Sequence, residues 1–284
     1  MTELDDVERF KLRNRVLLDV EAELTDDDKY QVGRYKLYRA IKNHIPSLPS
    51  APYHDPLRGL VSIPGAAMVF SECLGRALRE LANHINTFGS MIKRLEAWDL
   101  TIEGLDDMQI FSLSLEHIEP LANLAVSATQ SIRGQLIFAA VECGALANAF
   151  VGKEHGWNGK SNVDIHVAKR VADHWSAWPA LAAALSALRV EELNEASSNF
   201  RNDYQHGAPR SLVIGITTRT TWIDQGDGKI GWGVSNEDPI KLREIIPHLK
   251  NAHVRALKAL RAFHKLSQEW VAAMPPLPQT PIRL

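Results

Sequence analysis

Apolar residues recur at intervals of three and four along most of the chain, which is the pattern of helices that bury one face. Proline, glycine and capping residues divide this pattern into separate elements. The helical segments that it predicts are residues 3–44 with a break at 25–28, Ala66 to about one turn before Trp98, about 105–150 with an interruption near Pro120, and about 163–175, 177–188, 190–206 and 239–274.

One region departs from the helical pattern. Residues 212–223 and 229–234 are rich in β-branched and aromatic side chains, and they flank the turn sequence Asp-Gln-Gly-Asp-Gly at 224–228. Two such runs around a glycine-containing turn predict a β-hairpin. The fold class that follows is mainly α, a helical bundle with one β-hairpin inserted after the helix at 190–206.

The prolines suggest how the chain is organised. Five of them fall between Ile45 and Pro64, and proline cannot continue a helix interior. We therefore predict an N-terminal helical segment (1–44), a proline-rich linker (45–64), a helical domain (65–274, with the hairpin at about 211–234) and a proline-rich tail (275–284).

The last helix is amphipathic. Its apolar stripe consists of Leu242, Ile246, Leu249, Ala256, Leu260, Phe263, Trp270 and Met274. Its other faces carry Lys241, Arg243, Lys250, Arg255, Lys258, Arg261 and Lys265 against few acids. Such a basic face is able to meet RNA, but a solvated helix surface is the preferred interpretation.

Composition and charge narrow the class of protein. With 284 residues and 45% apolar content, the chain can build a core without disulfides or metal. The acidic amino terminus does not resemble a leader, and the longest apolar stretch, 134–151, includes three polar residues, so no membrane span is expected. Cys73 and Cys143 lack the paired spacing of a zinc site, which favours the reducing cytoplasm. The net charge of -2 means that contact with nucleic acid requires local basic patches.

The segment that carries chemistry is residues 200–207, Phe-Arg-Asn-Asp-Tyr-Gln-His-Gly. The guanidinium of Arg201 can pair with phosphate oxygens at any pH, and the imidazole of His206 exchanges a proton near neutrality. Positions five apart on a helix differ by about 140° in azimuth and about 7.5 Å in rise, so a shared substrate would lie across them. Asn202 is suited to orient an oxygen or the imidazole, and Tyr204 and Arg210 are predicted to bind substrate.

The spacing of arginine and histidine is not specific by itself, because it occurs three more times. These copies are Arg39 with His44, Arg79 with His84, and Arg243 with His248. The copy at Arg201 alone has an aromatic residue before the arginine, an amide after it, and a Gly-x-Pro helix ending beyond the histidine. Context therefore selects this copy.

These residues resemble the signature of the HEPN (higher eukaryotes and prokaryotes nucleotide-binding) family, an arginine and a polar residue followed after four to six positions by histidine. The resemblance implies a helical bundle that forms a homodimer, with Arg201, Asn202 and His206 of both copies in one cleft. It also implies cleavage of RNA without metal or other cofactor, leaving a 2′,3′-cyclic phosphate. Family members of this kind include toxins and antiviral effectors, some restrained by a protein partner. A catalytically inactive module that binds RNA or protein is the alternative.

Other residue clusters have simpler interpretations. Asp164, His166, Asp173 and His174 lack a recognised metal-ligand spacing and are expected at the surface. Five tryptophans near the motif are expected to pack in the core rather than stack on bases; they are Trp157, Trp175, Trp178, Trp222 and Trp232. Glu142, within an apolar helix, requires a partner for its carboxylate.

Overall fold

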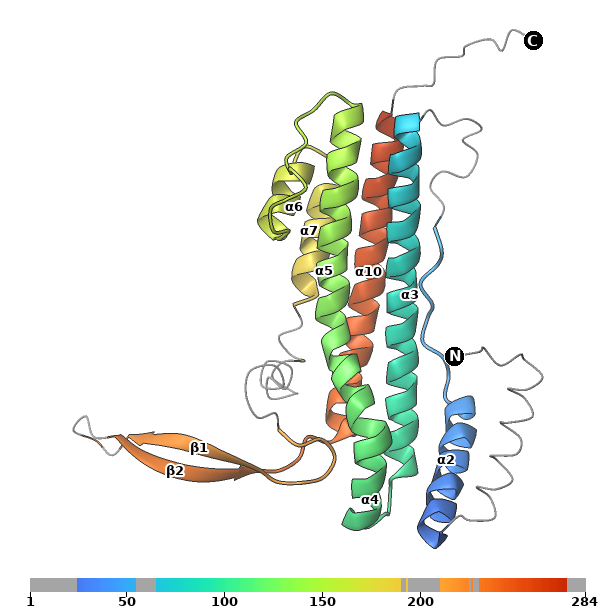
Figure 1. Ribbon diagram of the computed structural model, residues 1–284, viewed down its shortest axis with the longest axis vertical. Coiled ribbons are helices and arrows are strands. Elements are labelled where there is room, and N and C mark those ends of the chain that lie inside the picture. Colours follow the sequence, from blue (N-terminus) through green and yellow to red (C-terminus); the bar gives the residue numbers. More distant parts are fainter. Residues whose placement is uncertain are drawn as a thin grey trace, which may run out of the picture.

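The protein is an elongated helical bundle from which one β-hairpin projects (Figure 1). The computed structural model describes residues 25–54, 65–189, 193, 210–224, 226 and 230–274. The elements are α2 (Asp26–His44), α3 (Gly65–Thr101), α4 (Asp107–Leu113), the π-helical turn η1 (Ser114–Ile118), α5 (Glu119–Phe150), α6 (Ile165–Ala172), α7 (Trp178–Ala187), β1 (Thr217–Asp224), β2 (Ile230–Glu237) and α10 (Leu242–Ala273). This architecture confirms the predicted mainly-α fold with a hairpin.

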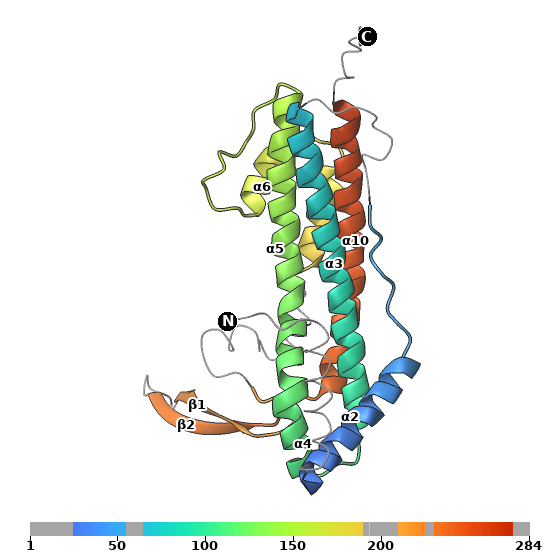
Figure 2. The ribbon, with the colours of Figure 1, turned by 45° about the vertical axis from the view of Figure 1, so that its right-hand side comes forward.

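The three long helices α3, α5 and α10 pack side by side along the length of the bundle, and α6 and α7 cover one side of them (Figures 1 and 2). The predicted stripe of α10 faces this core. Seven of its members are buried, namely Leu242, Ile246, Leu249, Ala256, Leu260, Phe263 and Trp270, while Met274 at the end is half-buried. Burial of these stripes, more than helix propensity, stabilises the helices.

Side-chain caps fix the start of several helices. The hydroxyl of Thr25 accepts the amide of Asp28, and the carboxylate of Asp28 accepts the amide of Thr25, so α2 begins at the predicted break. The predicted end of α3 before Trp98 is wrong, because the helix continues to Thr101. Trp98 is buried there, stacked between the rings of Tyr38 at 4.3 Å and His117 at 5.1 Å. Packing therefore extends the helix by more than one turn.

The interruption predicted near Pro120 is present as a π-helical turn rather than a break. The amide of Glu119 donates to the carbonyl of Ser114, five residues back, and Pro120 follows in the first turn of α5. Proline has no amide proton to donate, and the wider turn accommodates its ring while the chain stays helical. α4, η1 and α5 thus form one nearly continuous rod.

The described part of the proline-rich segment, residues 45–54, runs along α3 without forming a helix (Figure 1). It is held at two places. The side chain of Asn86 on α3 accepts the amide of Ala51 at 2.6 Å and donates to its carbonyl at 3.2 Å. Beyond this clamp, the ring of His54 stacks on that of His264 of α10, with centroids 3.6 Å apart.

This histidine pair makes stability depend on pH. Burial lowers the pKa of His54 and His264 below 6.5, and burial also lowers the pKa of His174 and His253. The unfolded chain therefore binds more protons than the native protein just below pH 6.5, so the free energy of unfolding is highest above that value and falls as the pH decreases through it. We expect urea denaturation to show lower stability at pH 5.5 than at pH 8, with a smaller difference in His264→Gln. Equal stability at the two pH values would contradict this.

The strands of the hairpin are antiparallel, with Thr217 opposite Glu237 and Trp222 opposite Trp232. The first strand begins at 217 rather than at the predicted 212. Leu212 instead forms an isolated parallel bridge with Ile240, and Val213 adopts a left-handed backbone conformation with φ 65°, which interrupts the extended chain.

Two polar pairs join α3 to α5. Arg76 and Glu142 form an ion pair at 3.2 Å, so Glu142 has the expected partner. The buried thiols of Cys73 and Cys143 lie 3.4 Å apart, and their hydrogen bond, followed by burial, raises the pKa of Cys143 well above its usual range.

Among the described helices, none combines the length and the apolar character needed to cross a bilayer.

Candidate nucleic-acid interface

Four of the five predicted site residues, Arg201, Asn202, Tyr204 and His206, lie outside the described residues, and Arg210 is described. The structure does describe the chain on either side of these four residues. Before them it describes residues 185–189 and 193, and after them residues 210–217.

The chain enters the segment from the hydrophobic core. α7 ends at Ala187, and Leu188 directly after it is buried. Leu193 is helical and only 2% exposed, as predicted from its place on the apolar face of the helix at 190–206. The predicted helix therefore has an inward-facing residue in its first turn.

Three arginines from different parts of the chain meet at the last turn of α7. Arg133 of α5 donates from Nε to the carbonyl of Leu185 at 3.0 Å, and Arg255 of α10 donates to the carbonyl of Ala187 at 3.1 Å. Arg189 follows α7, and its charge adds to burial in lowering the pKa of Arg133. Cations are stabilised by the unpaired carbonyls at the end of a helix. The result is a cluster of three arginines at the end of α7, about ten residues before the motif at 200–207.

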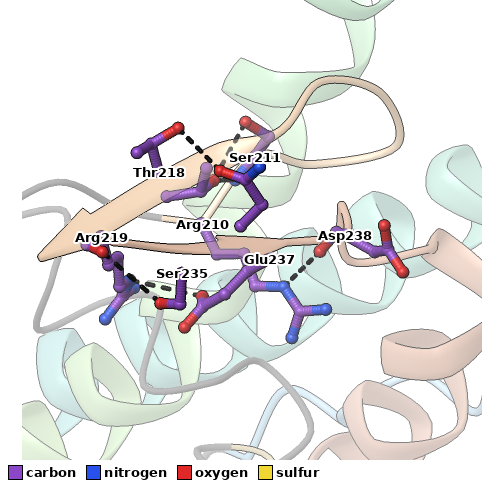
Figure 3. Close-up of polar contacts among 9 residues, drawn as sticks. Arg210, Ser211, Thr218, Arg219, Ser235, Glu237 and Asp238 are labelled. Carbon is purple, nitrogen blue, oxygen red and sulfur yellow. Dashed lines mark hydrogen bonds and ion pairs between the residues drawn. The ribbon is translucent and has the colours of Figure 1, made fainter. Parts of the chain in front are cut away.

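The chain leaves the segment at the base of the hairpin (Figure 3). Arg210 is half-buried, and its Nε donates to the carbonyl of Asp238, which follows β2. Two residues later, Leu212 pairs with Ile240, and both are buried in the core. Arg210 thus joins the two legs of the hairpin, and its predicted contact with substrate stays a prediction.

The hairpin presents an aromatic surface that the sequence interpretation missed. Trp175 and Trp178 are buried as expected, but the expectation of core packing is wrong for Trp222 and Trp232, which are 64% and 63% exposed. Their rings lie against each other, with centroids 3.5 Å apart. A two-stranded sheet has no second layer to cover this face, so a cross-strand pair can be exposed even when it is aromatic.

The opposite face of the hairpin is stabilised by smaller contacts. Arg219 and Glu237 form an ion pair at 3.3 Å, and Ser235 donates to the carbonyl of Arg219 at 3.5 Å (Figure 3). A β-carbon added at Gly233 would lie 2.4 Å from Cδ1 of Ile223. The glycine therefore leaves room for the Ile223 side chain to lie over the neighbouring strand. These contacts leave the tryptophan pair on the more exposed face.

Three of the four residues weighed as a metal cluster have separate roles. Asp164 caps α6 through the amide of Val167, and Asp173 pairs with Lys169. His174 forms a hydrogen bond of 3.0 Å with the side chain of Asn148. In the described part of the chain, no three histidine, cysteine or acidic side chains are grouped as metal ligands would be.

Comparisons with protein-family models, curated proteins and solved structures found no match to this chain. The HEPN resemblance therefore depends on residues 200–207. The surroundings described above add a basic surface before these residues and an aromatic hairpin after them. Together, these groups are able to contact the phosphates and the bases of a single strand.

Proposed function

We propose that this protein is a metal-independent RNA endonuclease of HEPN type that acts as a homodimer. Arg201 and His206 are its catalytic residues, and Asn202 supports them. In this role it would be a toxin or an antiviral effector restrained by a protein partner. The observation that carries the proposal is the arrangement of the two described ends of the motif segment, with arginines before it and an exposed tryptophan pair after it.

The proposed reaction needs a proton acceptor, a proton donor and a fixed positive charge. The 2′-hydroxyl of RNA attacks the adjacent phosphorus as His206 transfers protons, and the bond to the 5′-oxygen of the next nucleotide breaks. The products are a 2′,3′-cyclic phosphate and a 5′-hydroxyl. Arg201 stabilises the additional negative charge on the phosphate oxygens in the transition state.

The described residues support the binding part of this proposal. His206 is separated from Arg210 by four residue steps, and an extended chain covers at most about 14 Å in that interval. A strand of RNA held at the motif would therefore lie near the base of the hairpin. In Figure 1 the hairpin and the C-terminal end of α7 lie on the same side of the bundle.

A catalytically silent module that binds RNA is the second candidate, and the exposed tryptophan pair favours it because stacking on bases requires no catalysis. Purified protein incubated with RNA in the presence of EDTA separates the two. The endonuclease is expected to cleave RNA under chelation and to leave cyclic phosphate ends. Binding without cleavage would support the module and contradict the enzyme.

Both candidates predict that the tryptophan pair contributes to RNA affinity. Replacing Trp232 by alanine removes one stacking surface and is expected to weaken binding of a single-stranded RNA by about 5- to 150-fold, since one stacked base contributes about 1–3 kcal/mol. Fluorescence anisotropy at constant salt measures this. Trp232→Phe should retain most of the affinity, and Val234→Ala, at an exposed position of the same face, should change little. Unchanged affinity in Trp232→Ala would remove the hairpin from the RNA interface.

A further inference from the structure

The two cysteines of the chain meet in the core, although they are 70 positions apart in the sequence. Cys73 lies on α3 and Cys143 on α5, and their sulfur atoms are 3.4 Å apart. Both are free thiols, and neither takes part in the proposed cleavage of RNA. A disulfide bond would require the two sulfurs to approach by about 1.4 Å. The pair is therefore a candidate site of oxidation.

Packing around α5 keeps Cys143 opposite Cys73. Both residues lie at least seven positions from the ends of their helices. A β-carbon added at Gly144, next to Cys143, would lie 2.8 Å from Val171 of α6 and 3.3 Å from Trp270 of α10, so α5 has little room to move toward these helices. The two thiols are thus held together by the fold, which favours a disulfide inside one chain over a disulfide between chains.

The two thiols differ in their access to solvent. Cys73 is 7% exposed, whereas Cys143 is fully buried. A cavity of about 470 Å³ lies between α3 and α5. Its wall includes Ala77, one turn beyond Cys73, and Ala139, one turn before Cys143. A small oxidant in this cavity comes within one helical turn of the pair, and Cys73 is the more accessible thiol.

The charges beside the pair favour the same order of reaction. Arg76, one turn along α3 from Cys73, forms an ion pair with Glu142 at 3.2 Å, and its charge also interacts with Cys73. A cation beside a cysteine favours the thiolate, which is the form that reacts with peroxides. For Cys143, the hydrogen bond with Cys73, followed by burial, raises the pKa well above its usual range. Cys143 therefore stays a neutral thiol until Cys73 has reacted.

We propose that Cys73 and Cys143 form an oxidative modification site, in which a peroxide oxidises Cys73 beside Arg76 and Cys143 then closes a disulfide between α3 and α5. The Cys73 thiolate attacks one oxygen of hydrogen peroxide, the O–O bond breaks, and the departing hydroxide takes the thiol proton to form water. The Cys143 sulfur then attacks the sulfur of the Cys73 sulfenic acid, and the S–O bond breaks. The hydroxyl leaves as water with the proton of Cys143, so two electrons pass from the thiols to the peroxide.

The disulfide would make the protein respond to its redox surroundings. A cross-link between residues 70 positions apart restricts the unfolded chain, so the oxidised protein is expected to be the more stable form. In a reducing compartment, thiol exchange would return the pair to its free form. This site is separate from Arg201 and His206, and it does not require that the protein cleave RNA.

Peptide mapping of the full chain by mass spectrometry, after treatment with hydrogen peroxide and alkylation of the remaining thiols, tests this proposal. We expect the peptides that contain Cys73 and Cys143 to be joined within a single chain. The Tm of the oxidised protein should be about 4–16 °C above that of the reduced protein, because the cross-link restricts the unfolded chain. Dithiothreitol should restore both thiols and the lower Tm.

Three variants test the order of the steps. Cys143→Ala should stop at the sulfenic acid of Cys73, which dimedone traps, and Cys73→Ala should give no sulfenic acid at Cys143. Arg76→Gln removes the cation beside Cys73 and should slow the cross-link at least about threefold. Arg79→Gln, an exposed position of the same helix one turn further on, is the matched control and should react like the wild type.

Thiols that stay reduced after peroxide treatment would overturn the proposal, as would a cross-link that forms only between two chains. Sulfenic acid at Cys143 rather than at Cys73 would contradict the order of the steps, and equal rates in the wild type and Arg76→Gln would contradict the assignment of Arg76. RNA cleavage is not the readout, so failure of this proposal and failure of the nuclease proposal are distinguished.

Discussion

Replacing His206 by alanine is expected to lower the rate of RNA cleavage by about 10²- to 10⁴-fold, the contribution typical of a general acid or base. In the proposed reaction this imidazole moves the protons of the attacking and leaving oxygens, and alanine provides no group to do so. Initial rates with a fluorescent RNA in the presence of EDTA measure the loss. RNA affinity should change much less than the rate, because Arg201 and the other arginines of the chain are retained.

The chain contains a control with the same spacing. Arg79 and His84 are also five positions apart, both are exposed on α3, and His84 forms a hydrogen bond with the side chain of Gln135. His84→Ala removes an imidazole in the same sequence spacing but outside the motif, and it should leave cleavage unchanged. If His206→Ala and His84→Ala were equally active, the active site would have to be sought elsewhere in the chain.

Replacing Trp270 by alanine is expected to reduce the free energy of unfolding by about 3–5 kcal/mol, the usual range for removing a buried aromatic side chain. Trp270 of α10 is fully buried and packs edge-on against Phe263, with ring centroids 5.9 Å apart. Its ring also lies close to Gly144 of α5. A β-carbon added at Gly144 would be only 3.3 Å from the ring. The cavity left by alanine would thus open between two of the three long helices.

Urea denaturation measures this loss, and thermal unfolding should show a decrease in Tm of about 6–20 °C, at about 2–4 °C per kcal/mol for a chain of this size class. The matched control is Val254→Ala, an exposed position of the same helix, for which a change within about 0.5 kcal/mol is expected. A loss below about 1 kcal/mol for Trp270→Ala would mean that α10 is not packed against α5 as described.

Much of the fold was predictable because its signals are local. The stripe from Leu242 to Trp270 predicts which face of α10 is buried, and Thr25 with Asp28 predicts where α2 begins. Pro120 predicts the irregular turn before α5, although not its π-helical form. Each of these signals depends on residues within a few positions of one another, where the period of the helix or the loss of one amide proton decides the geometry.

The candidate site was only partly predictable. The residues of the motif are evident from their chemistry, but the arginines at the end of α7, before the motif in the chain, come from α5, from the residue after α7 and from α10. Nothing in the spacing of Arg133, Arg189 and Arg255 relates them to one another. The exposed position of Trp222 and Trp232 was also missed, because hydrophobic character predicts burial only where another layer is present to cover the side chain.

The sequence by itself determined most of the described helices and the hairpin, and its local context selected Arg201 and His206 among four pairs with the same spacing. Only the tertiary structure decided that Cys73 lies against Cys143 and that residues 47–50 lie beside Lys93, Arg94 and His253. The physical reason is that periodicity along the chain fixes which face of a helix is buried, whereas the neighbours of that face are set by how distant helices pack.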